Sequence, residues 1–209
     1  MTGVQLWISC IENVVSGNEI RRCRKPGVYL FGICSTLASS MPMTWNRGIG
    51  PLSFNHIEGT LCDETSCGIY LAAGNRFGLP VDFPRCLGNV RRHNSMISNR
   101  TDGILVNGLQ PGQSNHTSPS VLGTIAEFNV VRDAQNAYHL TPGVDATLLR
   151  RNHAYFWYPV KADPYTPIGF LIDAPQPVTI VEQNSIEGTQ GTGDRTVIPE
   201  QRGPKESDP

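Results

Sequence analysis

Four acidic side chains lie beside short apolar segments and could supply a pair of catalytic carboxyl groups. They are Glu58, Asp102 and Asp133, with Glu127 in reserve. Hydrolysis of a glycosidic bond requires two carboxyl groups at a defined separation, one protonated and one ionised. Any two of these residues that the fold brings together are therefore candidates for the acid and the base.

Histidine and arginine side chains offer a second chemistry. Elimination beside a uronate carboxylate needs a base near the acidic proton and a cation that stabilises the resulting anion. Candidates for the base and the cation are His56, His139, His153, Arg76, Arg92, Arg132 and Arg151. We predict His56, Glu58, Asp102, Asp133 and His153 as catalytic residues. Basic and aromatic side chains are the predicted substrate-binding residues, namely Tyr29, Tyr70, Arg76, Arg92, His139, Arg151 and Trp157.

The elements that must position these side chains follow a repeat. Its fullest copy is Asn55-His56-Ile57 followed by Gly68-Ile69-Tyr70-Leu71. The second half returns at Gly27, Gly103 and, with alanine replacing glycine, Ala137. A period of this size predicts a solenoid. The Asn-x-apolar step recurs at Asn18, Asn94, Asn129, Asn152 and Asn184.

The repeat spacing predicts where the chain carries insertions. The step from the asparagine to the glycine position is 9 residues from Asn18, 13 from Asn55, 9 from Asn94 and 8 from Asn129. The return to the next asparagine takes 28, 26 and 26 residues, but only 15 before Asn152. Three coils thus carry extra residues at one phase, so the insertions should stack on one side, which is usually the binding face of a solenoid.

Apolar and polar residues alternate in the short segments, as in strands with one buried face. Stacked coils about 4.8 Å apart would align the repeated asparagines into a ladder, with Asn at a left-handed corner. Ordinary surface turns are the alternative for these asparagines. Two outward columns are then expected: Glu19, His56, Ser95, Val130, His153 and Ser185 in one, and Tyr29, Tyr70, Leu105 and His139 in the other.

This repeat resembles the right-handed parallel β-helix proteins of the pectin-lyase-like superfamily over roughly residues 10 to 190. The segments 68–76 and 89–94 are similar to coils of β-helical glycoside hydrolases and lyases. The resemblance implies an all-β, right-handed parallel β-helix of about five coils over residues 1–186, with loop insertions on one side. Residues 187–209 are rich in Gly, Thr, Pro and charge, which predicts a disordered tail. The motifs of pectate lyases, polygalacturonases and mannuronan epimerases are not present.

Composition narrows the partners and the compartment. The 209 residues carry 17 basic and 18 acidic side chains, so the balance favours neither nucleic acid nor an anionic membrane. No stretch of 18 apolar residues predicts a membrane span. The first residues lack a charged leader and a cleavage site. We therefore expect an extracellular or periplasmic protein if a leader was lost, and a cytoplasmic one otherwise.

Six cysteines lie within the first 86 residues. Disulfides, buried free thiols and a zinc site all remain open, although a single Cys62-x4-Cys67 pair lacks the other ligands that zinc needs. We predict no metal site and no cofactor, with calcium the one ion that a sugar groove could use.

The pattern as a whole favours a carbohydrate-active protein. We expect a polysaccharide hydrolase or lyase that binds a polysaccharide or oligosaccharide in a groove along the solenoid axis. A non-catalytic scaffold that binds glycans or partner proteins is the alternative. The chain begins with strand-like sequence and no capping helix, so a partner or a missing segment is expected to cover the first coil.

Overall fold

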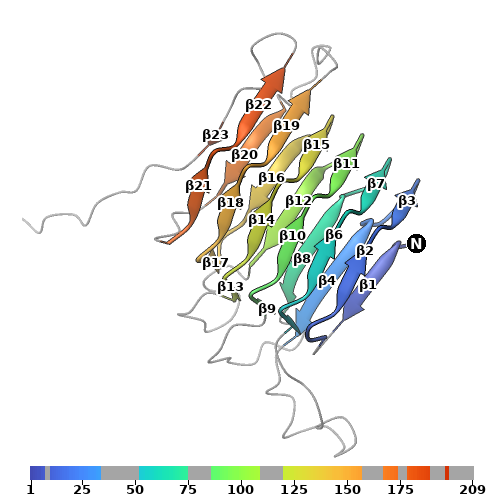
Figure 1. Ribbon diagram of the computed structural model, residues 1–209, viewed down its shortest axis with the longest axis vertical. Coiled ribbons are helices and arrows are strands. Elements are labelled where there is room, and N and C mark those ends of the chain that lie inside the picture. The colour runs from blue at the N-terminus through green and yellow to red at the C-terminus, as the bar shows by residue number, and fades with distance from the viewer. Residues whose placement is uncertain are drawn as a thin grey trace, which may run out of the picture.

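The computed structural model describes residues 1–7, 10–33, 52–74, 86–108, 120–156, 167–173, 178–188 and 196–197. Within these residues the regular elements are all strands, every strand pairing is parallel, and no helix is present. The strands form four sheets, called here A to D, in which neighbouring strands are distant in sequence. Figure 1 shows the strands stacked in order along one axis, from β1 to β22.

Sheets A and B have the longest and the shortest strands. Sheet A contains β1 (Val4–Trp7), β4 (Val28–Ile33), β8 (Ile69–Gly74), β12 (Asp102–Asn107), β16 (Asn136–Leu140), β20 (Ile168–Ile172) and β23 (Thr196–Val197). Sheet B contains β5 (Leu52–Ser53), β9 (Cys86–Leu87), β13 (Val121–Leu122) and β17 (Val144–Asp145).

Sheets C and D are built mainly from three-residue strands. Sheet C contains β2 (Val14–Ser16), β6 (His56–Glu58), β10 (Val90–Arg92), β14 (Ile125–Glu127), β18 (Leu148–Arg150) and β21 (Ile180–Glu182). Sheet D contains β3 (Glu19–Arg21), β7 (Leu61–Asp63), β11 (Ser95–Ile97), β15 (Val130–Arg132), β19 (His153–Phe156) and β22 (Ser185–Gly188).

The chain visits the sheets in a fixed order. Strands β5 to β8 lie in sheets B, C, D and A, and β9 to β12, β13 to β16 and β17 to β20 repeat that sequence. We call each such passage a rung. Because each strand pairs with its equivalents in the rungs before and after it, the predicted repeat of stacked parallel strands is confirmed.

The core lies between the sheets and follows from the strand length. In a three-residue strand only the central side chain faces inward. Except in the last strand of sheet C, β21, these central residues are buried and mostly apolar, as in Ile57 of β6, Met96 of β11 and Val131 of β15. Sheet A adds Leu30, Leu71 and their equivalents. The exception is Arg91 of β10, which is fully buried among them.

The corners between short strands adopt left-handed backbone conformations, but not at the predicted residues. At the corner between sheets C and D, φ is 54° for His93, 55° for Phe128 and 52° for Arg151. Each of these residues precedes a ladder asparagine. The asparagine itself must face inward, because its amide bonds to backbone groups of the preceding rung, so the strained position falls on its neighbour.

The predicted asparagine ladder is two ladders. Asn94, Asn129, Asn152 and Asn184 are linked in order by side-chain hydrogen bonds of 2.9 to 3.1 Å. The prediction that Asn55 belongs to this row is wrong, since Thr60 occupies that position on its rung.

Asn55 instead lies in a second ladder with Asn13 and Asn89, at 3.0 Å in both pairs. His56 consequently lies between Val14 and Val90 in sheet C, not beside Glu19 in sheet D. The 13-residue step from Asn55 is explained in the same way, because the step from Thr60 to Gly68 is 8.

The insertions predicted on one side are the loops at residues 34–50, 75–88 and 109–122, and each follows one of three neighbouring strands of sheet A, β4, β8 and β12. Residues 34–50, 75–85 and 109–119 lie outside the described residues, whereas the ends of the second and third loops contain β9 and β13. The predicted tail from residue 187 includes the end of β22 and also β23, which pairs with β20. The rest of that segment lies outside the described residues.

Candidate functional site

The outward face of sheet A carries the column predicted from the sequence. Tyr29 is in register with Tyr70, Tyr70 with Leu105, and Leu105 with His139. Leu171 of β20 continues the row. Residues more than one hundred positions apart therefore line one face along the stacking axis, as the repeat predicted.

Two tyrosines form an aromatic platform at the start of this column. The ring centroids of Tyr29 and Tyr70 are 5.1 Å apart and their planes are inclined by 19°. Burial, followed by the proximity of Tyr70, raises the pKa of Tyr29 to about 12, so its phenol is neutral at physiological pH. Stacked neutral rings offer a flat apolar surface of the kind that sugar rings pack against.

An ion-paired histidine lies two strands beyond Tyr70, on β16. His139 Nδ1 is 3.0 Å from Asp102 Oδ1, and His139 Nε2 is 2.8 Å from Asp173 Oδ2. The Asn136 amide donates to the same Asp102 oxygen at 2.9 Å. Only 17% of the His139 side chain and 8% of that of Asp102 are exposed, against 38% for Asp173. Asp173 is therefore the carboxylate of this group that a ligand can reach.

The two carboxylates favour the protonated form of His139. Burial is the largest single influence and lowers the pKa of His139, but the hydrogen bonds and charges of Asp102 and Asp173 together outweigh it, and the pKa is raised. Both ring nitrogens can then donate, one to each carboxylate. With His139 protonated, the group Asp102–His139–Asp173 carries two carboxylates around one imidazolium.

Replacing Asp102 by asparagine should lower the pKa of His139. The variant loses one hydrogen-bonded carboxylate while the burial of the ring persists. NMR titration of the imidazole Cε1 proton measures this pKa directly. Because the folded-state pKa lies above the unfolded value of about 6.5, the associated stability is fully present below that pH and is lost as pH rises through the folded pKa.

The control for this titration is Asp63→Asn, which removes a carboxylate from sheet D. It should leave the His139 titration unchanged. A His139 pKa that does not fall in Asp102→Asn would contradict the assignment of the ion pair.

A second hydrogen-bonded row lies next to the column. Asn107 Nδ2 donates to the Tyr70 hydroxyl at 2.9 Å, and Thr141 Oγ1 donates to Asn107 Oδ1 at 2.8 Å. Asn107, Thr141 and Asp173 occupy equivalent positions at the ends of neighbouring strands. We call the combined set the sheet A site: Tyr29, Tyr70, Asp102, Asn107, Asn136, His139, Thr141 and Asp173.

The charge of the sheet A site is distinctive. None of the described strands of sheet A contains a lysine or arginine. The only cation in the site is His139, and Asp102 and Asp173 flank it on both sides. The described part of this face therefore suits an uncharged ligand better than a polyanion.

The remaining predicted catalytic residues lie on other faces. His56 and Glu58 are on β6 of sheet C, and His153 is on β19 of sheet D. Asp133 is at the corner that follows β15. Of the five predicted residues, the sheet A face has only Asp102, so the structure does not bring that set together.

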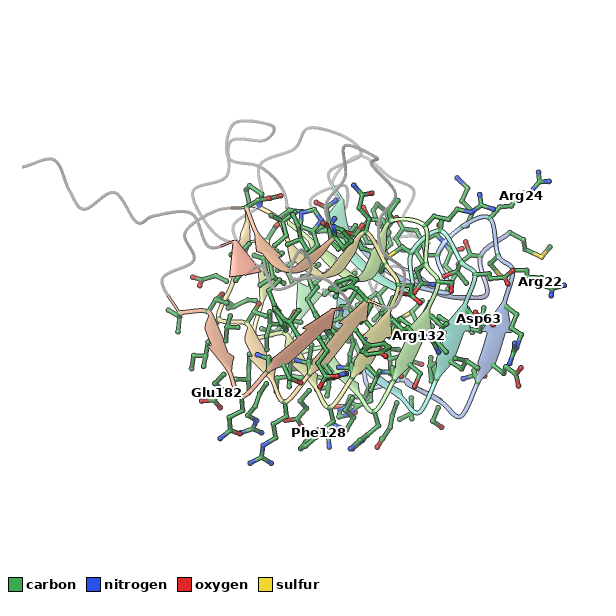
Figure 2. All side chains as sticks on the ribbon, turned by 90° about the horizontal axis from the view of Figure 1, so that it is seen from above. Arg22, Arg24, Asp63, Phe128, Arg132 and Glu182 are labelled. Atoms are coloured by element: carbon green, nitrogen blue, oxygen red, sulfur yellow. The ribbon has the colours of Figure 1, made fainter. Side chains whose placement is uncertain are left out.

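Most of the predicted basic residues are engaged in pairs on sheets C and D. Arg92 and Arg150 both contact Glu127, at 3.7 and 2.7 Å. Arg151 lies over the Phe128 ring at 5.5 Å. Figure 2 shows Phe128, Arg132 and Glu182 along the stack, away from the end that bears Arg22.

Arg132 contacts Asp133 at 3.3 Å and lies 6.0 Å from the centre of the Tyr155 ring. His153 Nδ1 is 2.6 Å from Ser185 Oγ. The predicted binding residues Arg76 and Trp157 lie outside the described residues.

The described part of the chain contains free thiols, and burial makes one of them unreactive. Cys23, Cys62 and Cys67 carry free thiols. Burial, then the proximity of Cys23, raises the pKa of Cys62 to about 12, so its reactive thiolate form is suppressed.

No group of three or more His, Cys, Asp or Glu among the described residues is placed to hold a metal ion. No helix there has the length and apolarity needed to cross a membrane.

Sequence reasoning missed Asp173, Asn107, Asn136 and Thr141. A signal was available for three of them, since each follows the apolar strand residues at the same phase of the repeat, as in Leu-Val-Asn107, His-Leu-Thr141 and Leu-Ile-Asp173. Aligning the repeats at that position predicts a row of polar side chains beside the column.

The strand arrangement agrees with a known class of fold. All described strands are parallel and lie in stacked sheets, which is compatible with a parallel β-helix. No protein-family model matches the chain, and no curated protein and no solved structure shows significant similarity to it.

Proposed function

We propose that this protein is a carbohydrate-active, right-handed parallel β-helix of about five coils, similar to the pectin-lyase-like superfamily, that binds a polysaccharide along the outward face of sheet A. The observation that carries the proposal is the alignment of the Tyr29–Tyr70 platform with Asp102–His139–Asp173 on one continuous face. A linear row of aromatic and polar groups fits a linear polymer better than a compact ligand.

We favour hydrolysis over elimination as the reaction. Elimination from a uronate needs a cation for the substrate carboxylate, and the described strands of sheet A offer no lysine or arginine. Hydrolysis needs a general acid and a general base, roles that Asp173 and His139 can take. Asp102 and Asp173 lie on opposite sides of the His139 ring, and Asp173 is the more exposed of the two. A neutral polysaccharide is the corresponding substrate class.

Each residue then has a defined role. Asp102 accepts the His139 Nδ1 proton and fixes the ring. Transfer of the Nε2 proton to Asp173 gives a protonated carboxyl that donates to the leaving oxygen as the glycosidic bond breaks. The water that adds to the anomeric carbon gives its proton to His139 Nε2, and both groups return to their starting charge.

The direct test is a panel of neutral glucans, xylans and mannans beside polygalacturonate and alginate. We expect turnover of a neutral polymer, with Asp173→Asn lowering kcat by about 100-fold or more. Tyr70→Ala should weaken binding roughly 2- to 10-fold through loss of the stacked ring.

The matched control for this panel is His153→Gln, a histidine substitution on sheet D that should change neither quantity. Absence of binding and turnover across the panel would contradict the proposal, as would loss of activity in His153→Gln alone.

A non-catalytic glycan scaffold is the second candidate. The observation that favours it is the pairing of His139 with both carboxylates within the protein. A scaffold would bind the same neutral polymer with no turnover, and Tyr70→Ala would weaken that binding while Asp173→Asn would leave reaction products absent as before.

A further inference from the structure

Arg91 places a charged side chain inside the core of the stack. It is the central residue of β10, in register with Ile57 on one side and Ala126 on the other, and these positions face inward. None of its surface is exposed. A guanidinium group therefore occupies a position that carries an apolar side chain on the neighbouring rungs.

The guanidinium has no protein partner in the described part of the chain. Nε, Nη1 and Nη2 of Arg91 are all buried and none of them makes a hydrogen bond there. The buried carboxylate of Asp102 is already bonded to His139 and Asn136. Buried polar groups in folded proteins almost always have a partner, and an unpaired buried charge is strongly destabilising.

Two buried thiols influence the guanidinium without neutralising it. Cys86 and Cys67 both raise the pKa of Arg91, but less than burial lowers it. Each thiol donates to a carbonyl at 3.6 Å, Cys86 to Ala72 and Cys67 to Ile69, and burial raises the pKa of Cys67. Burial lowers the pKa of Arg91 to about 10, which still leaves the guanidinium charged at physiological pH.

We propose that the core of the stack holds a small inorganic anion, chloride under physiological conditions, on the guanidinium of Arg91. Five N–H donors and a positive charge call for one anionic acceptor. The residues in register with Arg91, Ile57 and Ala126, are also fully buried, which favours a small ligand over a large one. Beside Arg91 the next rung has Ala126, whereas the equivalent position one rung further has Leu149, so a short side chain adjoins the guanidinium.

Thermal unfolding in chloride and in gluconate at equal ionic strength tests the site. Because an anion that binds only the folded state stabilises it by mass action, we expect the Tm to rise by about 5 °C or more at a chloride concentration roughly 100-fold above Kd. Arg91→Met should remove this dependence. Arg92→Met, a substitution of the adjacent arginine on the outward face, should retain it.

A second measurement does not depend on the variant folding. Crystals of the unaltered protein grown in bromide should show an anomalous peak within contact distance of the Arg91 guanidinium. Absence of that peak overturns the proposal, as does a Tm that is equal in chloride and gluconate, or a chloride effect that persists in Arg91→Met.

Discussion

Asn129→Ala is expected to lower the free energy of unfolding by about 3–5 kcal/mol, because Asn129 lies at the centre of the longer ladder. Its Oδ1 accepts from the Asn94 backbone N–H at 3.1 Å and from the Asn94 amide at 2.9 Å. Its Nδ2 donates to the Arg91 carbonyl and to Asn152 Oδ1, both at 3.0 Å. Alanine removes the partner that these buried groups share on the two neighbouring rungs. Urea denaturation monitored by circular dichroism measures the loss.

The control for the ladder is Asn18→Ala. Asn18 occupies the same phase of the repeat, but its amide donates only to the exposed Ser16 carbonyl. We expect a loss of about 1 kcal/mol or less. Equal losses in the two variants would show that the stacked amides contribute nothing beyond an ordinary turn.

Gly68→Ala should be at least as damaging. A Cβ at Gly68 would lie 2.2 Å from Met96 Cγ and 2.4 Å from the Gly103 carbonyl oxygen. The methionine can shift, but the backbone of the next rung cannot do so without breaking its own pairing. We expect a loss of about 3 kcal/mol or more, measured by the same denaturation, or failure to fold.

Gly17→Ala separates this steric effect from the conformational one. Gly17 has φ +62°, and a Cβ added there would meet no atom within 4 Å, so alanine incurs only the left-handed backbone penalty of about 1 kcal/mol. A loss in Gly68→Ala no larger than this would refute the close approach between rungs.

The repeat made the stacking of the rungs predictable, and with it the column on sheet A. Gly27 and Gly68 mark the same phase, so Tyr29 and Tyr70, two residues after each, had to be neighbours if the chain stacked at all. That inference needs only the period and the alternation of strand side chains. It did not depend on where any corner lies.

The ladder was harder because each rung has two equivalent corners, five residues apart, and either can carry an asparagine. Asn13 and Asn18 both fit the Asn-x-apolar pattern, Asn89 precedes Asn94 by the same five residues but is followed by Arg91 at the apolar position, and Thr60 interrupts one row. A sequence pattern cannot tell these phases apart when one asparagine stands alone on its rung. The hydrogen-bond register places Asn55 in the first row, and His56 therefore lies away from the predicted column.

The repeat period alone does not predict the contacts of His139. Asp102 and Asp173 are 37 and 34 residues away, on the strands that flank β16. Both distances follow from the lengths of individual rungs. Only the registered strands show that the two carboxylates meet opposite ends of one imidazole ring.

Rungs of different length form the same ladder bonds. Asn129 and Asn152 are stacked neighbours separated by 23 residues, whereas Asn94 and Asn129 are separated by 35 with equivalent bonding. A spacing of 23 residues is therefore enough to form the ladder bonds, and the additional residues of the longer rungs are not needed for them. We therefore expect that segment 109–119 can be replaced by other peptides while the asparagine ladder stays unchanged.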